Sequence, residues 1–487
     1  MLLTAWFRAR RGSVSPKDHS LNRISSPSKA LTCGLRQRLH LNEDRYLFSL
    51  IPRPNFFHSG HTYRAILVLF LGSAFASTLG QTTMQSMQAS PADSFVDSIG
   101  VNTHLTYQNT LYYTAWPQVF SDLQDLGVRH IRDGYFNPNW GPPYTTEHQQ
   151  LGQAGVRTDF VVPYDPTITP QSIEDLASVA QDMELLEAPN ECDLTGSCGG
   201  TTQAEGLSNM LGFMPTIQAA GSSLSVPVIG PSFAAYESYA LVGNVASKMT
   251  YNNLHVYFGG RNPGSSGWGA PDAEGNAYGS FQFWLDQANI DGPGLPSMIT
   301  ETGYMSFPGN PTPYTIPLNV EASYIPRTFL LAYMHGIGRS YQYELLEDPN
   351  SPGFGLIDGN LTERPAYFAL KNLIANLADP GPSFTPGQLQ FSIQGGDSTL
   401  NHMLFQKRDG SFWMILWLEQ SSFDTVNQVA TPVTAQDVTL TLGGGYVAPN
   451  VGTFDESGNL NWTSAQPAGS VVPLTVSDQL TIVKILP

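Results

Sequence analysis

Lysine and arginine are scarce in this sequence, which holds 23 of them against 40 Asp and Glu residues in 487 positions. Residues 1–80 contain 11 of the basic and 3 of the acidic residues, so the remaining 407 residues contain 12 and 37, a balance of −25. A polyanion such as DNA or RNA gains affinity when Lys and Arg neutralise its phosphates. The scarcity of basic residues beyond position 80 therefore argues against a nucleic-acid-binding protein and leaves neutral ligands open.

The sequence also lacks an apolar run of the about 20 residues that a membrane-spanning helix needs. Its run AILVLFLG at 65–72 is shorter, follows Arg64, and precedes Ala74 and Ala76 in the A-x-A pattern that signal peptidase recognises. We therefore expect a leader with a signal peptide over 1–76, with cleavage after Ala76, and a linker over 77–96. The mature protein is expected to be secreted or periplasmic, without a stable membrane anchor.

Cysteine is rare, with three in the whole chain. Cys33 lies within the expected leader, whereas Cys192 and Cys198 remain in the mature part. An oxidising compartment would allow this pair to form a disulfide, and two separate thiols are the alternative. No His or further Cys stands near them at ligand spacing, so we expect no zinc site. We expect neither a metal nor a cofactor elsewhere.

The composition favours a globular fold, because 41% of the residues are apolar and only 13% are charged. The length exceeds that of most single domains, so a large domain with a smaller one is expected.

From about residue 97, short apolar runs rich in β-forming residues alternate with stretches of helical periodicity such as 115–127, 173–183 and 365–378. Eight such runs are present, at 98–105, 128–134, 158–164, 183–189, 226–232, 251–257, 296–302 and 339–346. Eight strand–helix units predict a (β/α)₈ TIM barrel over 97–380. The alternative, a doubly wound open sheet, lacks its Gly-rich phosphate turn here.

After the Pro- and Gly-rich stretch 379–387 the periodicity changes to two. The runs 389–394, 401–419, 436–444 and 479–486 alternate apolar and polar residues and are separated by turn signals. The sequence therefore predicts a small all-β sandwich domain over 381–487.

Two glutamates close the fourth and seventh expected strands, Glu191 after LLEAPN and Glu301 in SMITETGY. In a TIM barrel the active site forms at the C-terminal ends of the strands. One such glutamate would ordinarily be a solvated rim residue, but a pair on opposite strands suits cleavage of a glycosidic bond. That reaction needs a proton for the leaving oxygen and a nucleophile or base on the other face of the sugar.

The pattern E-x-x-N-E at 187–191, a Glu closing the seventh strand, and eight βα units followed by a sandwich resemble the clan A retaining glycoside hydrolases, which include families 5, 39 and 79. The resemblance extends over about 98–378. It departs from many clan members at Cys192, where they have Pro, and at Pro189, where they have an aromatic residue or Gly. These departures leave the exact family unassigned.

The resemblance implies a role for each matching residue. Glu191 would be the acid/base and Glu301 the nucleophile. Asn190 would hydrogen-bond the substrate 2-hydroxyl. Arg132 in HIRDG, ending the second strand, would pair with the nucleophile and keep it ionised, and Tyr257 in HVY, ending the sixth, would donate to it.

Other residues are candidates for binding the sugar, although strand histidines are as often satisfied core residues. These candidates are His255 in the sixth strand, His104 in the first, Tyr341 or Tyr343 in the eighth, and Trp268 at the tip of the long loop after the sixth strand. Glu187, four residues before Glu191, is expected to point into the lower layer of the barrel as a structural hydrogen-bonding group.

The expected partner is an oligosaccharide, a polysaccharide or a glycoside. The acidic charge balance favours a neutral β-linked glycan, and a uronic-acid glycoside stays open because a single Arg can hold one carboxylate. A non-catalytic carbohydrate-binding barrel is one alternative function. A metal-assisted hydrolase is another, and it would need a His/Asp cluster at the strand ends that the sequence does not show.

Overall fold

The structure is a computed structural model that describes residues 83–306 and 314–487, all of which belong to one compact unit. The expected leader, its cleavage site and the first residues of the expected linker lie outside the described residues. Among the described residues, no helix combines the length and the apolar character that crossing a bilayer requires.

Eight parallel strands form the barrel, and the predicted (β/α)₈ architecture is confirmed. They are β3 (Ile99–Asn102), β4 (His130–Gly134), β5 (Arg157–Val161), β6 (Met183–Glu187), β7 (Val228–Ile229), β8 (Asn252–Val256), β9 (Ser297–Thr302) and β10 (Ser340–Gln342). Their order is β7-β6-β5-β4-β3-β10-β9-β8, and a parallel bridge between Ile229 and Tyr251 joins the two end strands. Each predicted run overlaps one strand.

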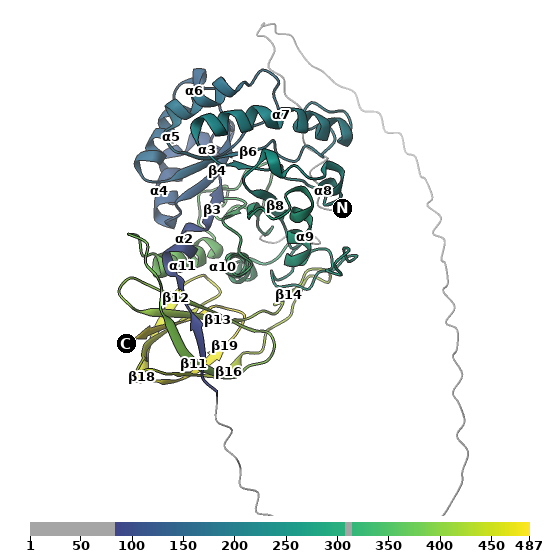
Figure 1. The fold of residues 1–487 in the computed structure, drawn as a ribbon. Coiled ribbons are helices and arrows are strands. Elements are labelled where there is room, and N and C mark those ends of the chain that lie inside the picture. The colour runs from purple at the N-terminus through teal and green to yellow at the C-terminus, as the bar shows by residue number, and fades with distance from the viewer. Residues whose placement is uncertain (1–82, 307–313) are drawn as a thin grey trace, which may run out of the picture. The chain divides into compact units, whose positions relative to one another are not determined.

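Helices connect the strands and cover the barrel (Figure 1). They are α2 (Ala92–Asp97), α3 (Leu111–Thr114), α4 (Trp116–Leu126), α5 (Tyr144–Gln153), α6 (Pro170–Ala180), α7 (Gln203–Leu224), α8 (Glu237–Val242), α9 (Phe281–Asp291), α10 (Leu318–Met334) and α11 (Pro365–Leu377). In α4, Val119, Leu123 and Leu126 form the buried face, and Gly127 ends the helix with a φ of 80°. The positive φ is the reason that glycine suits this end.

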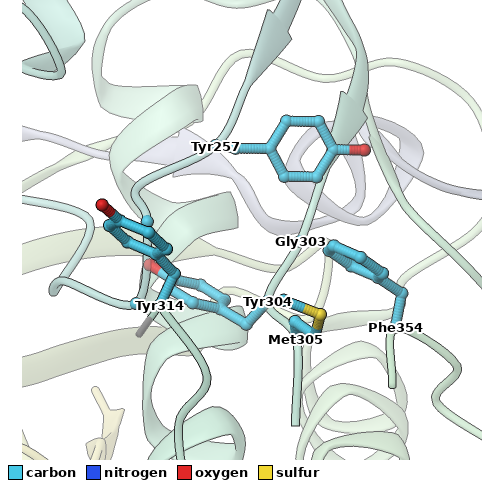
Figure 2. Close-up of a pocket in the computed structure, with 8 residues that line it drawn as sticks. Tyr257, Gly303, Tyr304, Met305, Tyr314 and Phe354 are labelled. Atoms are coloured by element: carbon cyan, nitrogen blue, oxygen red, sulfur yellow. The ribbon is translucent and has the colours of Figure 1, made fainter. Parts of the chain in front are cut away.

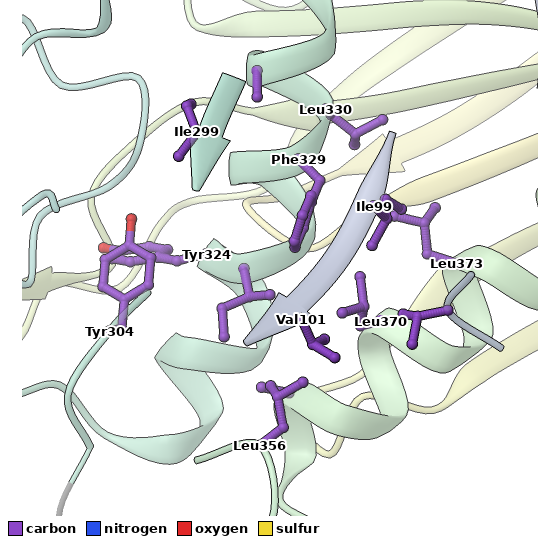
Figure 3. Close-up of a cluster of buried hydrophobic side chains, with 14 of the residues drawn as sticks. Ile99, Val101, Ile299, Tyr304, Tyr324, Phe329, Leu330, Leu356, Leu370 and Leu373 are labelled. Carbon is purple, nitrogen blue, oxygen red and sulfur yellow. The ribbon is translucent and has the colours of Figure 1, made fainter. Parts of the chain in front are cut away.

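Apolar side chains on the outer faces of the strands pack against the helices. Figure 3 shows Ile99 and Val101 of β3 and Ile299 of β9 beside Phe329 of α10 and Leu370 of α11, all of them buried. Since successive side chains of a strand point to opposite faces, the other residues of these strands face the barrel interior. Polar side chains that face the barrel interior can therefore form a binding or catalytic site.

The C-terminal residues form the predicted sandwich (Figure 1). One sheet holds β1 (Gln85–Gln88), β11 (Gln388–Gly395), β16 (Gln436–Leu442) and β19 (Val471–Val476). The other holds β18 (Leu460–Gly469), β17 (Val447–Phe454), β20 (Thr481–Leu486), β13 (Phe412–Leu418), β12 (Leu400–Gln406) and β2 (Ser90–Pro91), and β14 (Phe423–Asp424) pairs with β15 (Val429–Ala430).

The linker expected over 77–96 is wrong in part, because residues 85–91 contain β1 and β2. Each of these is an edge strand of one sheet of the sandwich. Helix α2 follows directly. The sequence QSMQ of β1 is polar and short, so it carries no strand pattern of its own. Pairing with β11 stabilises it instead, which a local sequence pattern cannot reveal.

A buried ion pair joins α10 to the sandwich. The Arg327 guanidinium, fully buried, binds the Glu419 carboxylate, which follows β13. Glu419 also accepts hydrogen bonds from Trp417 Nε1 at 2.8 Å, from Asn262 Nδ2 at 2.7 Å and from the backbone N–H of Gly264 at 3.0 Å. This one carboxylate therefore fixes the start of the loop that follows β8.

Replacement of Glu419 by Ala should destabilise the protein strongly. It leaves Arg327 buried without its counter-charge, which costs about 3–5 kcal/mol in comparable cases. Urea unfolding of the variant measures this loss, and Glu456→Ala, at an exposed turn of the sandwich, is the control. A loss below about 1 kcal/mol would contradict the anchoring role.

The buried Glu321 of α10 should make stability depend on pH. Burial raises its pKa from 4.5 to about 8, and Arg364 and Ser306 offset only part of this. The folded protein therefore binds this proton more tightly than the unfolded chain, so the stability that it contributes is complete below about pH 4.5 and is lost as the pH rises to about 8. Glu321→Gln should raise the melting temperature more at pH 8.5 than at pH 5. An equal change at both pH values would refute this.

Candidate active site

The barrel brings three of the predicted residues together at the C-terminal ends of its strands. One carboxylate oxygen of Glu191, one of Glu301 and the Nδ1 atom of His255 all lie within 4.8 Å of one another. Glu191 follows β6, His255 belongs to β8 and Glu301 to β9. Glu191 and Glu301 are 110 positions apart in sequence, and yet they belong to one polar centre.

A β-bulge in β9 turns Glu301 towards this centre. Leu254 of β8 pairs with Ile299, but the next residue, His255, pairs with Glu301, so Thr300 is an extra residue in β9. The register of β9 with β10 shifts at the same place. A bulge re-aims the side chains that follow it, and here Thr300 and Glu301 both face the barrel interior.

Glu191 sits in a backbone conformation that is unusual for its residue type, with a φ of 45°. The loop after it is held by the disulfide between Cys192 and Cys198, so the pairing left open by the sequence is formed. Asp193 also fixes the loop by accepting hydrogen bonds from the backbone N–H groups of Ala234 at 3.1 Å and Ala235 at 2.8 Å. Such strain persists where the surroundings enforce it, and it is common at functional sites.

Arg132 donates hydrogen bonds to three other residues of the site. Its Nη1 atom donates to Glu301 at 2.7 Å, its Nε and Nη2 atoms donate to both oxygens of Glu187 at 2.7 Å, and Nη2 also donates to Asn190 Oδ1 at 2.8 Å. The side chain is 6% exposed. Despite this burial, Glu187 and Glu301 raise the pKa of Arg132 well above its ordinary value, so the guanidinium stays charged.

The surroundings of Glu301 favour its ionised form. Burial alone would raise the pKa of this carboxyl, but His255, Arg132 and the Tyr257 hydroxyl outweigh that effect and lower it. Tyr257 donates to Oε2 at 2.9 Å, and Arg132 to Oε1 at 2.7 Å. Both oxygens are therefore hydrogen-bonded, and the carboxylate carries its charge at neutral pH.

His255 bridges the two glutamates. Its Nδ1 atom lies 3.0 Å from Glu191 Oε1 and 3.5 Å from Glu301 Oε2. Burial lowers the pKa of this imidazole, but the two carboxylates outweigh burial and raise it. The ring therefore holds a proton between the two carboxyl groups more readily than a free histidine does.

The same three residues are a donor set that could hold a metal ion, a cluster that the sequence did not reveal. Arg132 and Tyr257, however, already donate to both oxygens of Glu301. A guanidinium at 2.7 Å repels a second cation at that carboxylate. The donor set therefore fits a pair of carboxylates with a proton between them better than it fits a metal centre.

Glu187 is a structural hydrogen-bonding group, as expected, and its main partner is Arg132, which donates to both of its oxygens. It also accepts from Asn253 Nδ2 at 3.0 Å and Thr300 Oγ1 at 3.4 Å. Asp159 of β5 lies beside it, fully buried. Burial and the neighbouring Glu187 raise the pKa of Asp159 well above its ordinary value, so this carboxyl keeps its proton and can share it with Glu187.

The other candidates divide into those near the centre and those away from it. Tyr343 lies close enough to Glu301 to interact with it electrostatically, and its ring is 5.7 Å from Phe354 and 5.6 Å from His104. His104 Nε2 is 3.3 Å from Glu344. Tyr341 is wrong as a sugar-binding residue: it is fully buried, packs over Gly100, and is close to Arg339 and Asp159 in the barrel interior.

Trp268, expected at the tip of the long loop after the sixth strand, packs against other side chains of that loop. It is partly buried, makes an edge contact with Tyr278 at 5.6 Å, and covers Gly279. Phe354 and Asp159 were missed by sequence reasoning. Phe354 gave no signal because it lies in an irregular segment, and Asp159 because a single acid inside an apolar run is not diagnostic.

The fold belongs to the class that the geometry suggests, a (β/α)₈ barrel carrying a β-sandwich, as in glycoside hydrolases of clan A. No protein-family model matches the chain, and no curated protein matches it in sequence. Among solved structures it is similar to a family 39 glycoside hydrolase from Bacteroides cellulosilyticus WH2, with a TM-score of 0.51 and 15% identity over 82% of this chain and 81% of that one.

Two further structures are less similar. A family 17 β-1,3-glucanosyltransferase from Rhizomucor miehei has a TM-score of 0.41 at 16% identity, over 56% of this chain and 97% of that one. β-Glucuronidase 2 of Bacteroides uniformis has a TM-score of 0.44 at 10% identity, over 81% of this chain and 48% of that one. Only the likeness to the family 39 structure bears on the fold, and at 15% identity it establishes nothing about the substrate.

Glu187→Gln should weaken any reaction in which Glu301 acts as a base or nucleophile. Without the Glu187 charge, Arg132 is balanced by Glu301 alone, so the pKa of Glu301 should fall further and the acidic limb of the pH profile should move to lower pH. We expect kcat to fall about ten- to hundredfold, because Arg132 loses its second anchor. A pH profile of kcat/KM measures both effects.

Asp159→Asn is the matched variant, since an amide replaces a carboxyl that already carries its proton. It should leave the acidic limb in place. A shift in Asp159→Asn as large as that in Glu187→Gln would contradict the protonation assigned to Asp159.

Proposed function

We propose that this protein is a glycoside hydrolase that cleaves O-glycosidic bonds with retention of anomeric configuration. The observation that carries the proposal is the pair Glu191 and Glu301, with oxygens within 4.8 Å of each other and Glu301 held ionised. Carboxyl groups about 5–5.5 Å apart suit a covalent double displacement, whereas inversion needs about 6.5–9.5 Å for an intervening water.

In the first step Glu301 attacks the anomeric carbon and Glu191 gives its proton to the glycosidic oxygen. The bond to that oxygen breaks, the leaving group departs as an alcohol, and the sugar becomes an ester of Glu301. In the second step Glu191 takes a proton from water, the resulting hydroxide attacks the anomeric carbon, and Glu301 leaves as a carboxylate. Arg132 and Tyr257 hold Glu301 in place through both steps.

Asn190 is placed to bind the substrate. Its Oδ1 atom accepts from Arg132 at 2.8 Å and from Ser232 at 3.3 Å. Its amide NH₂ group has no hydrogen-bond acceptor in the described part of the chain, so it can donate to a hydroxyl beside the anomeric carbon. Hydrogen bonds to the 2-hydroxyl strengthen in the transition state of this reaction.

The disulfide supports export of the protein, and the buried charge of Glu301 supports a catalytic function. The disulfide between Cys192 and Cys198 is of a kind that persists in oxidising compartments, which supports a secreted or periplasmic protein. A non-catalytic carbohydrate-binding barrel would have no need of an ionised Glu301 buried against Arg132, because burying such a charge is costly. The catalytic function therefore explains the site better than the binding function.

The substrate is proposed to be a β-linked glycoside. The acidic charge balance disfavours long anionic polymers and favours neutral glycans.

Glu301→Gly and Glu191→Gly should give azide products of opposite configuration from one aryl β-glycoside. Loss of Glu301 should abolish hydrolysis, and azide entering from the vacated face should give the α-glycosyl azide. Loss of Glu191 should still allow Glu301 to displace the activated aryl group, so azide then attacks the ester and gives the β-glycosyl azide. Product NMR distinguishes the two.

Glu456→Gly, in an exposed turn, is the control for the substitution itself and should hydrolyse the substrate normally. Ordinary hydrolysis by Glu301→Gly would refute the proposed function, and so would inversion in the first product of the unmodified protein.

A further inference from the structure

The two glutamates of the centre are held in different ways. Glu301 belongs to β9, and both of its oxygens accept hydrogen bonds, from Arg132 at 2.7 Å and from Tyr257 at 2.9 Å. The Tyr257 ring packs edge-on against Phe354, with 5.9 Å between the ring centroids (Figure 2). The sheet and the packing of a donor therefore place Glu301.

Glu191 has no such support from the barrel sheet. Strand β6 ends at Glu187, so Glu191 lies four residues beyond it. Its carboxylate is bound through one oxygen, which lies 3.0 Å from His255 Nδ1. The direction of this side chain therefore depends on the backbone of the loop that carries it, which has a φ of 45° at Glu191. An L-residue adopts this left-handed conformation only at a cost in free energy, so its surroundings must enforce it.

The residues on both sides of Glu191 are fixed independently of it. Asn190 accepts a hydrogen bond from Arg132 at 2.8 Å. Cys192 is fully buried and forms the disulfide with Cys198. A residue between two fixed neighbours takes the backbone dihedral angles that join them. The positions of Asn190 and Cys192 therefore impose the positive φ of Glu191.

The far end of the disulfide is attached to helix α7. The carbonyl oxygen of Cys198 accepts a hydrogen bond from Asn209 Nδ2 at 2.9 Å. A Cβ atom added to Gly206 of α7 would lie 2.2 Å from the carbonyl oxygen of Cys192, so the helix backbone touches the loop at that point. The disulfide thus ties the residue that follows Glu191 to a helix of the barrel wall.

Stabilisation of the whole fold does not account for this disulfide. It joins residues with a sequence separation of 6, and the chain entropy that a disulfide removes from the unfolded state grows with the length of the loop that it closes. Asp193 already anchors the chain beyond Cys192, because it accepts hydrogen bonds from the backbone N–H groups of Ala234 and Ala235. What the disulfide adds is therefore local, at the residues next to Glu191.

We propose that Cys192 and Cys198 are positioning residues, whose disulfide sets the direction in which the Glu191 carboxyl gives its proton to the leaving oxygen. The role in proton transfer rests on the proposed function, whereas the placement of the carboxyl beside His255 does not. Opening the disulfide lets Glu191 return to a negative φ, which turns its carboxyl away from His255. Glu301 keeps its place on β9. A protein without the bond therefore retains its nucleophile and loses most of its acid catalysis.

Phenyl and dinitrophenyl β-glycosides of glucose, galactose, mannose and xylose test the role in proton transfer. A dinitrophenyl group leaves without protonation, whereas an unsubstituted phenyl group needs the proton of Glu191. Cys198→Ala opens the bond and keeps Cys192 in its buried place. For the sugar that is cleaved, kcat/KM should fall about ten- to hundredfold with the phenyl glycoside and less than about twofold with the dinitrophenyl glycoside, because kcat/KM reports the first step.

Two controls separate positioning from a general loss of stability. Leu440→Ala, in the core of the sandwich, does not touch the loop and should change kcat/KM for both leaving groups by the same factor. Dithiothreitol opens the bond in the unmodified protein: the two sulfurs gain two electrons and two protons, and the dithiol becomes a cyclic disulfide. It should reproduce the selective loss and should not change Cys198→Ala further. An equal fall for both leaving groups, or no fall for the phenyl glycoside, would overturn the inference.

NMR titration of His255 without any substrate tests the placement of Glu191. Burial lowers the pKa of this imidazole, but Glu301 and Glu191 outweigh burial and raise it. The pKa should fall in Cys198→Ala towards its value in Glu191→Gln, which lacks the charge of that carboxylate. If the unmodified protein cleaves none of the glycosides, the proposed function fails and this titration alone decides the inference. An unchanged pKa of His255 in Cys198→Ala would overturn it.

Discussion

The site depends on the guanidinium of Arg132. It joins Glu301 of β9, Glu187 of β6 and Asn190 after β6 from a single position on β4. Each of these groups would be costly to bury alone, and a charged partner with planar, paired donors reduces that cost. The geometry of Glu301, of the Asn190 amide and of Glu187 is therefore set by one side chain.

A second buried cation, Arg327, holds a loop in place, as Arg132 holds residues at the strand ends. Through Glu419 it connects α10, the sandwich and the segment that holds Asn262 and Gly264. That segment follows directly from Tyr257 and Arg261. The sandwich thus acts as a support for the residues on one side of the centre, and its role does not require a ligand-binding surface of its own.

Periodicity predicted the barrel and the sandwich, because each buried strand and helix needs an apolar face whatever its neighbours are. The pair Glu191 and Glu301 could be named from strand ends, but their separation could not be measured. The bulge at Thr300 is invisible in SMITET, since an extra residue shows only against the partner strand. Tyr341 and Tyr343 look equivalent at period two, yet β10 ends at Gln342, so only Tyr343 reaches the mouth. The polar strand β1 likewise exists only through its partner.

The cationic and acidic groups of the centre stabilise one another's charged forms. The pKa of Arg132 is raised by Glu187 and Glu301 despite burial, and the pKa of His255 is raised by Glu301 and Glu191 despite burial. In the proposed reaction Glu191 gives up its proton as Glu301 becomes an ester, so one carboxylate charge forms while another is lost. The charge that Arg132 faces at the centre therefore stays the same through the proposed first step, so its guanidinium needs no rearrangement while the sugar is transferred.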